Sequence, residues 1–114
     1  MAPRKNPLKL NKLQLRTLVL AQVIAREPEL ARVDPASGDA ELLQLPHTHG
    51  DHVHIGPYVV SARDASGFNN PAVWTALERK GLARQDSPLT MTLTKAGLDY
   101  DTGLGGAFME QSDH

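Results

Sequence analysis

Apolar residues recur at three- and four-residue steps between residues 10 and 26, and this spacing predicts the first helix of the chain. Asn11 suits the N-cap position. Pro28 predicts that the helix ends near Glu27, because a proline disfavours helical geometry in the residue before it. The predicted inward stripe consists of Leu10, Leu13, Thr17, Leu20 and Ile24, widened by Leu18 and Ala25.

Two short apolar runs follow a PASGD turn, and they predict strands. ELLQLP at 41–46 and HVHIGPYVV at 52–60, joined by HTHGD, predict one β-hairpin with a long turn. In the second run, Val53 and Ile55 share one side of an extended chain, and His52 and His54 share the other. Pro57 indicates that this strand lies at a sheet edge or is interrupted there.

The residues after position 60 predict a short helix, a turn and a longer helix. SARDAS at 61–66 favours a helix that Ser61 caps and Gly67 ends. For the next helix, Asn70 suits the N-cap and Pro71 the first helical position. The expected inward stripe of this helix is Val73, Trp74, Leu77 and the stem of Lys80, and Gly81 is the expected residue after its end.

The remaining residues predict a second hairpin and a last short helix. LARQDSP (82–88) and LTMTLT (89–94) read as two extended segments joined by a Ser-Pro turn, which predicts a hairpin over 83–93. Thr94 suits the N-cap of a short helix, KAGLDYD. The fold class expected from the whole pattern is therefore α+β.

Length and charge define the expected organisation. The chain has 114 residues, which predicts one domain, and it has no cysteine, which excludes disulfides and thiolate metal sites. The net charge is −1, but residues 1–16 carry five bases and no acid, residues 72–95 are basic, and residues 27–51 and the last 17 residues are acidic. We expect a basic N-terminal arm at 1–9, a folded domain at 10–100 and a flexible acidic tail at 101–114. If the two basic segments share a face, that face could bind phosphate.

The sequence shows neither an apolar run of membrane-spanning length nor a secretory signal, so we expect no membrane partner and a cytoplasmic location.

The segments SARDASGFNNPAVWTALERKGLA (61–83) and MTLTKAG (91–97) resemble the winged-helix DNA-binding domain, and they are similar to the MarR-like and PadR-like bacterial regulators. Three features carry the resemblance: the Gly67-Phe68-Asn69 turn, LERKGL at 77–82 and LTKAG at 93–97. It implies a winged helix-turn-helix with a three-helix core, a C-terminal β-hairpin wing at 83–93, and an extra hairpin between the first two helices. The helix before the turn is shorter than is usual in this family.

The resemblance implies a bacterial or phage transcriptional regulator that is not an enzyme and binds double-stranded DNA, by default as a homodimer. The helix over about 70–81 would enter the major groove. Its outward positions are small, polar or basic, and the free N–H groups at its start favour a phosphate. The expected DNA-binding residues are Asn69, Asn70, Thr75, Arg79, Lys80, Arg84, Gln85 and Lys5.

The stretch HTHGDHVHIG holds four of the five histidines, and its first six letters fit the metal-binding signature of the metallo-β-lactamase superfamily. A two-metal hydrolase of that kind needs a larger sandwich and further ligands downstream, where this chain offers only His114. No cofactor is expected, although a single zinc site remains open, with His47, His49, His52 and His54 as ligands. A plain polar turn also remains open.

Two alternative functions therefore accompany DNA binding. The acidic 27–51 segment and the acidic tail would suit a winged helix that acts as a protein-interaction or assembly module. The histidine cluster would suit a regulator that senses a metal or pH, because imidazoles change charge near neutrality.

Overall fold

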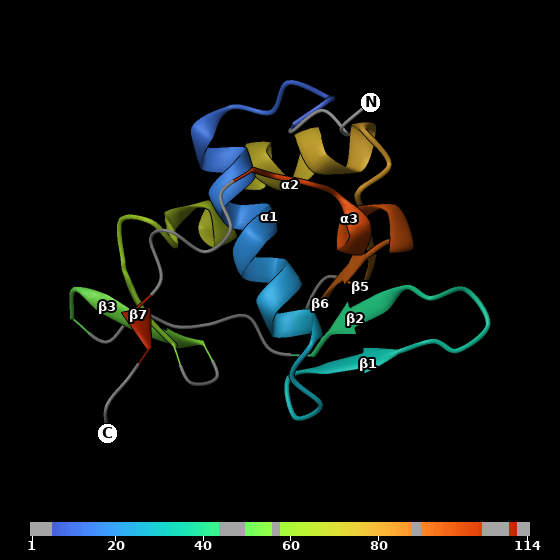
Figure 1. The fold of residues 1–114 in the computed structure, drawn as a ribbon, viewed down its shortest axis with the longest axis horizontal. Coiled ribbons are helices and arrows are strands. Elements are labelled where there is room, and N and C mark those ends of the chain that lie inside the picture. Colours follow the sequence, from blue (N-terminus) through green and yellow to red (C-terminus); the bar gives the residue numbers. More distant parts are fainter. Residues whose placement is uncertain (1–5, 44–49, 56–57, 88–89, 104–109, 112–114) are drawn as a thin grey trace.

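The computed structural model describes residues 6–43, 50–55, 58–87, 90–103 and 110–111. Within these residues the chain is α+β, as predicted, with three α-helices and two antiparallel sheets (Figure 1). Helix α1 lies between the two sheets, and side chains from both sheets, from η1 and from α2 join it in one hydrophobic core. None of the helices in the described part of the chain has the length and apolar content that crossing a bilayer requires.

Helix α1 (Lys12–Ala25) confirms the first prediction, including its cap. The Asn11 side chain accepts a hydrogen bond from the Gln14 N–H, and the Gln14 side chain accepts one from the Asn11 N–H. This capping box satisfies two backbone donors at the start of the helix. The helix is covered on nearly all sides, and its buried residues are Leu15, Thr17, Leu18, Val19, Leu20, Ala21, Gln22, Ile24 and Ala25.

The first sheet has the strand order β1-β2-β6-β5. Its strands are β1 (Ala31–Val33), β2 (Ala40–Leu42), β5 (Ala83–Ser87) and β6 (Thr90–Leu93). The predicted hairpin over 83–93 is confirmed as β5–β6, and β2, which precedes it by some 40 residues in the chain, hydrogen-bonds to β6. The sheet packs its Ala40, Leu42 and Leu93 side chains into the core.

The second sheet shows that the first predicted hairpin was wrong in its pairing. Strand β3 (His52–Ile55) pairs with β4 (Tyr58–Ser61), and β7 (Glu110–Gln111) adds to β4. The run HVHIGPYVV thus folds back on itself, because Gly-Pro favours a reversal and local pairing closes the shorter loop. Strand β2 pairs on both sides within the other sheet, so Glu41 and Leu42 do not pair with 52–60, and the rest of the predicted strand, 44–46, lies outside the described residues.

The helix predicted over 61–66 is also replaced by a tighter structure. Residues 62–65 form turns, and a 3-10 helix, η1 (Ser66–Asn69), follows with Gly67 inside it instead of after it. The Ser61 hydroxyl accepts the Asp64 N–H at 3.1 Å and donates to the Asp64 carboxylate at 3.0 Å. Such local bonds favour a turn over a helix, and six residues are too few to form a stable helix alone.

Helix α2 (Pro71–Arg79) matches its prediction closely. The Asn70 side chain accepts the Ala72 N–H at 3.0 Å, and Val73, Trp74 and Leu77 are buried. Gly81 follows the helix with φ +75°, a conformation that suits glycine. Lys80 is exposed, so the expected inward packing of its stem is wrong; as the C-cap it lies beyond the last buried turn.

Helix α3 (Lys95–Asp99) begins at Thr94, whose hydroxyl accepts the Gly97 N–H at 3.1 Å, as predicted. The buried Gln22 amide ties this helix to α1, because it donates to the carbonyls of Gly97 and Tyr100. Residues 6–9 are fixed to the same region: the Asn6 N–H donates to the Asp101 carbonyl at 2.8 Å. The described part of the predicted tail is likewise attached, since Thr102 is buried and Glu110–Gln111 pair with β4.

Candidate nucleic-acid interface

The outer face of α2 is open to solvent. Thr75, Arg79 and Lys80 are all exposed, as is Ala72, while Ala76 is half-buried. Within the described part of the chain, neither the Arg79 nor the Lys80 side chain has a hydrogen-bond or ion-pair partner. The expected base-reading surface is therefore neither packed against α1 nor sealed inside the molecule.

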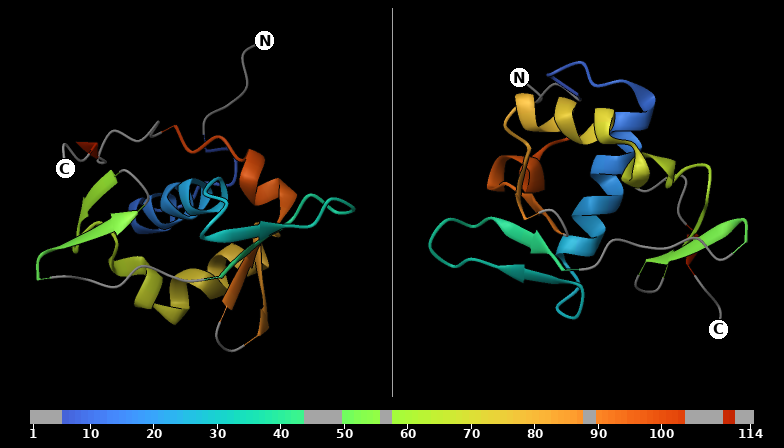
Figure 2. Two further views of the ribbon diagram at one scale, coloured as in Figure 1. Left: turned by 90° about the horizontal axis from the view of Figure 1, so that it is seen from below. Right: turned by 180° about the vertical axis from the view of Figure 1, so that it is seen from behind.

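The β5–β6 ribbon extends to the same side of the molecule as α2 (Figure 2, left). One contact fixes the helix against this ribbon: a Glu78 carboxylate oxygen accepts the Gln85 N–H at 3.2 Å. Gln85 itself is exposed, beside the exposed Glu78. This acidic residue reduces the positive potential near Arg79 and Lys80, so the face carries a modest net charge.

The start of α2 gives a mixed result for the two predicted asparagines. The Asn70 carboxamide is occupied as the N-cap, where it satisfies one of the free N–H groups that an anion would otherwise meet. Asn69 lies in η1, the element immediately before this cap. Lys5 lies outside the described residues.

Arg84 does not join the face of α2. Its guanidinium donates to the carboxylate of Asp39, whose other oxygen accepts the Lys95 N–H at 2.8 Å. The Arg84 hydrogen bond, followed by that of the Lys95 backbone, lowers the pKa of Asp39 below its usual value of 3.8. This ion pair joins the β1–β2 hairpin, β5 and the start of α3.

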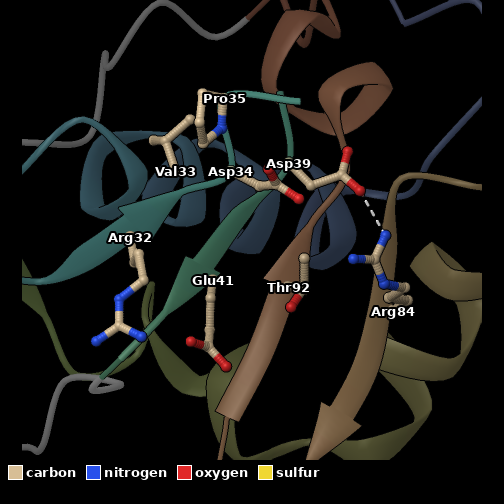
Figure 3. A pocket seen from close by; sticks show the side chains of 8 residues that line it. All are labelled: Arg32, Val33, Asp34, Pro35, Asp39, Glu41, Arg84 and Thr92. Carbon is tan, nitrogen blue, oxygen red and sulfur yellow. Dashed lines mark hydrogen bonds and ion pairs between the residues drawn. The ribbon is translucent and has the colours of Figure 1, made fainter. Parts of the chain in front are cut away.

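The Arg84–Asp39 pair lies in a shallow cleft of about 380 Å³ on the open face of the first sheet (Figure 3). A row of paired residues crosses the sheet beneath it: Arg32 opposes Glu41, Glu41 opposes Thr92, and Thr92 opposes Arg84. No residue of α2 lines this cleft. The predicted pairing of the 41–46 segment with 52–60 did not reveal this row. The signal in the sequence was the alternation of apolar and charged residues in ARV (31–33) and AEL (40–42).

The histidines gather only in part. His52 and His54 lie on one face of β3, with ring centroids 4.9 Å apart, and His52 Nδ1 is 3.3 Å from an oxygen of Asp51. His47 and His49 lie outside the described residues. In the portion of the chain that the structure describes, no three histidine or acidic side chains come together as a metal site.

Comparisons of the chain with protein-family models, with curated proteins and with solved structures found no significant match.

Proposed function

We propose that this chain is a winged-helix protein that binds double-stranded DNA and regulates transcription. Helix α2 would enter the major groove, and the β5–β6 ribbon would act as the wing. The strand order supports this proposal, because β2 precedes α2 in the chain and pairs with β6, the returning strand of the ribbon. The first helix, strand β2, helix α2 and the ribbon thus follow one another in the order of a winged helix, with the 3-10 helix η1 where that fold has its second helix.

The observation that carries the proposal is the free outer face of α2. A reading helix must bury one stripe and leave small, polar or basic residues on the other. Here Val73, Trp74 and Leu77 are buried, whereas Thr75 and Arg79 are exposed. A basic side chain without an internal partner retains its capacity to bind a phosphate or a guanine edge.

Two features modify the expected interface. The element before α2 is a single 3-10 turn, so this first arm of the helix-turn-helix offers little surface to the DNA backbone. Arg84 is held by Asp39, so the DNA contacts of the ribbon would come from residues nearer its tip than Arg84. Arg79 and Lys80 therefore carry most of the expected electrostatic attraction.

The test is a salt titration of the protein with duplex DNA. Arg79→Ala together with Lys80→Ala should lower the affinity about 10- to 100-fold at moderate salt, because two phosphate contacts disappear. The slope of log K against log salt should become shallower by about two units. Fluorescence anisotropy at several salt concentrations measures both effects.

The matched control is Arg26→Ala, which removes an exposed arginine at the end of α1. It should change the affinity less than either Arg79→Ala or Lys80→Ala alone. Equal losses in the control and the test variants would contradict a specific role for α2. No binding even at low salt would favour a protein-interaction module, which the acidic 27–51 segment and the Glu78 carboxylate within α2 suit better than DNA.

A further inference from the structure

Strand β1 forms an open edge of the first sheet. Among the described residues it pairs only with β2, and the described elements leave its other side uncovered in the ribbon views (Figures 1 and 2). Val33, on this edge, is 52% exposed, the largest value among the exposed large apolar residues of the described chain. An apolar side chain on an uncovered edge strand is the usual setting for pairing with another strand.

The hydrogen-bond pattern shows which backbone groups face the open side. Leu43 donates to Leu30, and Asp34 donates to Asp39, so the even-numbered residues of β1 exchange bonds with β2. The N–H and C=O of Val33 consequently point away from β2. The Ala31 N–H is already bound to the Glu27 carbonyl. Val33 is thus the position at which a further strand would pair.

The side chains on either side of Val33 carry opposite charges. Arg32 and Asp34 are both exposed and lie on the cleft face of the sheet (Figure 3). Within the described residues, the Arg32 side chain has no ion-pair or hydrogen-bond partner, and the Asp34 carboxylate accepts only the Ala36 N–H. Neither side-chain charge is neutralised by another described residue.

We propose that a second copy of this chain pairs with β1 in antiparallel register, with Val33 of each copy facing the other across a two-fold axis. The two Val33 residues would exchange both of their backbone hydrogen bonds. In this register Arg32 of each copy lies opposite Asp34 of the other, so two free cations meet two free anions. The pairing ends after Asp34, because Pro35 has no N–H to donate.

The geometry of this dimer deepens the proposed function and rests on it. The four-stranded sheets of the two copies would join at β1 into one sheet of eight strands, with a β5 strand at each end. Seven strand spacings of about 4.8 Å place the two β5 strands at most about 34 Å apart, which is close to the separation of successive major-groove half-sites. Both copies of α2 would lie on one side of the dimer, because the two-fold axis is perpendicular to the joined sheet and α2 packs with α1 into the core, on the face opposite the cleft.

Sedimentation equilibrium without DNA tests the dimer independently of any function. The native chain should approach twice its 12.4 kDa as its concentration rises. Arg32→Glu alone should remain monomeric, because its new carboxylate would face Asp34 of the other copy. Asp34→Lys alone should also remain monomeric, since its new ammonium would face Arg32. Mixing these two variants should restore the dimer as a heterodimer with paired charges.

Arg63→Glu, a charge reversal in the exposed turn before η1, should dimerise like the native chain. Circular dichroism verifies that every variant is folded. A native chain that stays monomeric at all concentrations would overturn the proposal, as would a mixture that stays monomeric. A dimer that binds no DNA would leave this interface standing and refute the proposed function alone.

Discussion

At the scale of single residues, two glycines show where the fold leaves no room for a side chain. A Cβ on Gly67 would lie 1.8 Å from the Thr17 hydroxyl oxygen, and one on Gly97 would lie 2.1 Å from the Leu82 carbonyl. Both distances are below van der Waals contact. The first close approach lets η1 pack directly on α1, and the second brings α3 against the connection between α2 and β5.

Gly67→Ala should therefore destabilise the protein by about 2–3 kcal/mol, because the new methyl group forces the two elements apart. Thr17→Ala should cost about 1–2 kcal/mol, since it removes a buried hydroxyl that donates to the Leu13 carbonyl. The double variant should lose about 1 kcal/mol less unfolding free energy than the two single variants lose together, because Thr17→Ala removes the atom closest to the new methyl group. Urea unfolding of the four proteins measures this coupling, and strict additivity would contradict the packing described.

At the scale of elements, caps and ion pairs decide how helices and hairpins join. The Asp39 carboxylate receives Arg84 from β5 and the first N–H of α3, and Asp39 itself ends the β1–β2 turn. Three elements that are distant in sequence thus meet at one side chain. The Asp39 side chain is only 14% exposed, but the Arg84 side chain is 46% exposed, so solvent weakens the attraction between the two charges.

Asp39→Asn should lower the free energy of unfolding at neutral pH by about 1 kcal/mol. The folded pKa of Asp39 lies below its usual value of 3.8, so its contribution is complete above that pH and is lost as the pH falls through the folded pKa. The difference between Asp39→Asn and the native protein should therefore vanish in strong acid. Denaturant titrations between neutral and acidic pH measure it; a difference that stays constant with pH would exclude the ion pair as its cause.

At the scale of the whole molecule, α1 joins two sheets into one cooperative unit. The core cluster includes Val53, Ile55 and Val60 from one sheet and Ala40, Leu42 and Leu93 from the other. Both groups share contacts with the helix between them. We therefore expect the described body of the protein to unfold as one unit instead of sheet by sheet.

Ile55→Ala tests this cooperativity, because Ile55 is 1% exposed and lies in the second sheet, whereas the sole tryptophan lies in α2. It should lower stability by about 2–4 kcal/mol and shift the Trp74 fluorescence transition together with the circular dichroism transition. Leu43→Ala, at a position that is 39% exposed, should shift both far less. Separate midpoints for the two signals in Ile55→Ala would show that the sheets unfold independently.

The sequence by itself determined the three helices, because apolar spacing and capping residues are local signals. Asn11, Asn70 and Thr94 all cap as predicted, and β5–β6 pairs across a short turn within one segment. The openness of α2 at Thr75 and Arg79 follows from the same helical periodicity.

Only the tertiary structure decided which strands pair and where the charges meet. Strand β2 could pair with any neighbour of suitable pattern, and its choice of β1 and β6 depends on the core beneath it. The partnership of Arg84 with Asp39, 45 residues away, follows from that choice. Contacts between distant residues carry no local signature, because their free energy arises only when the chain closes around the core.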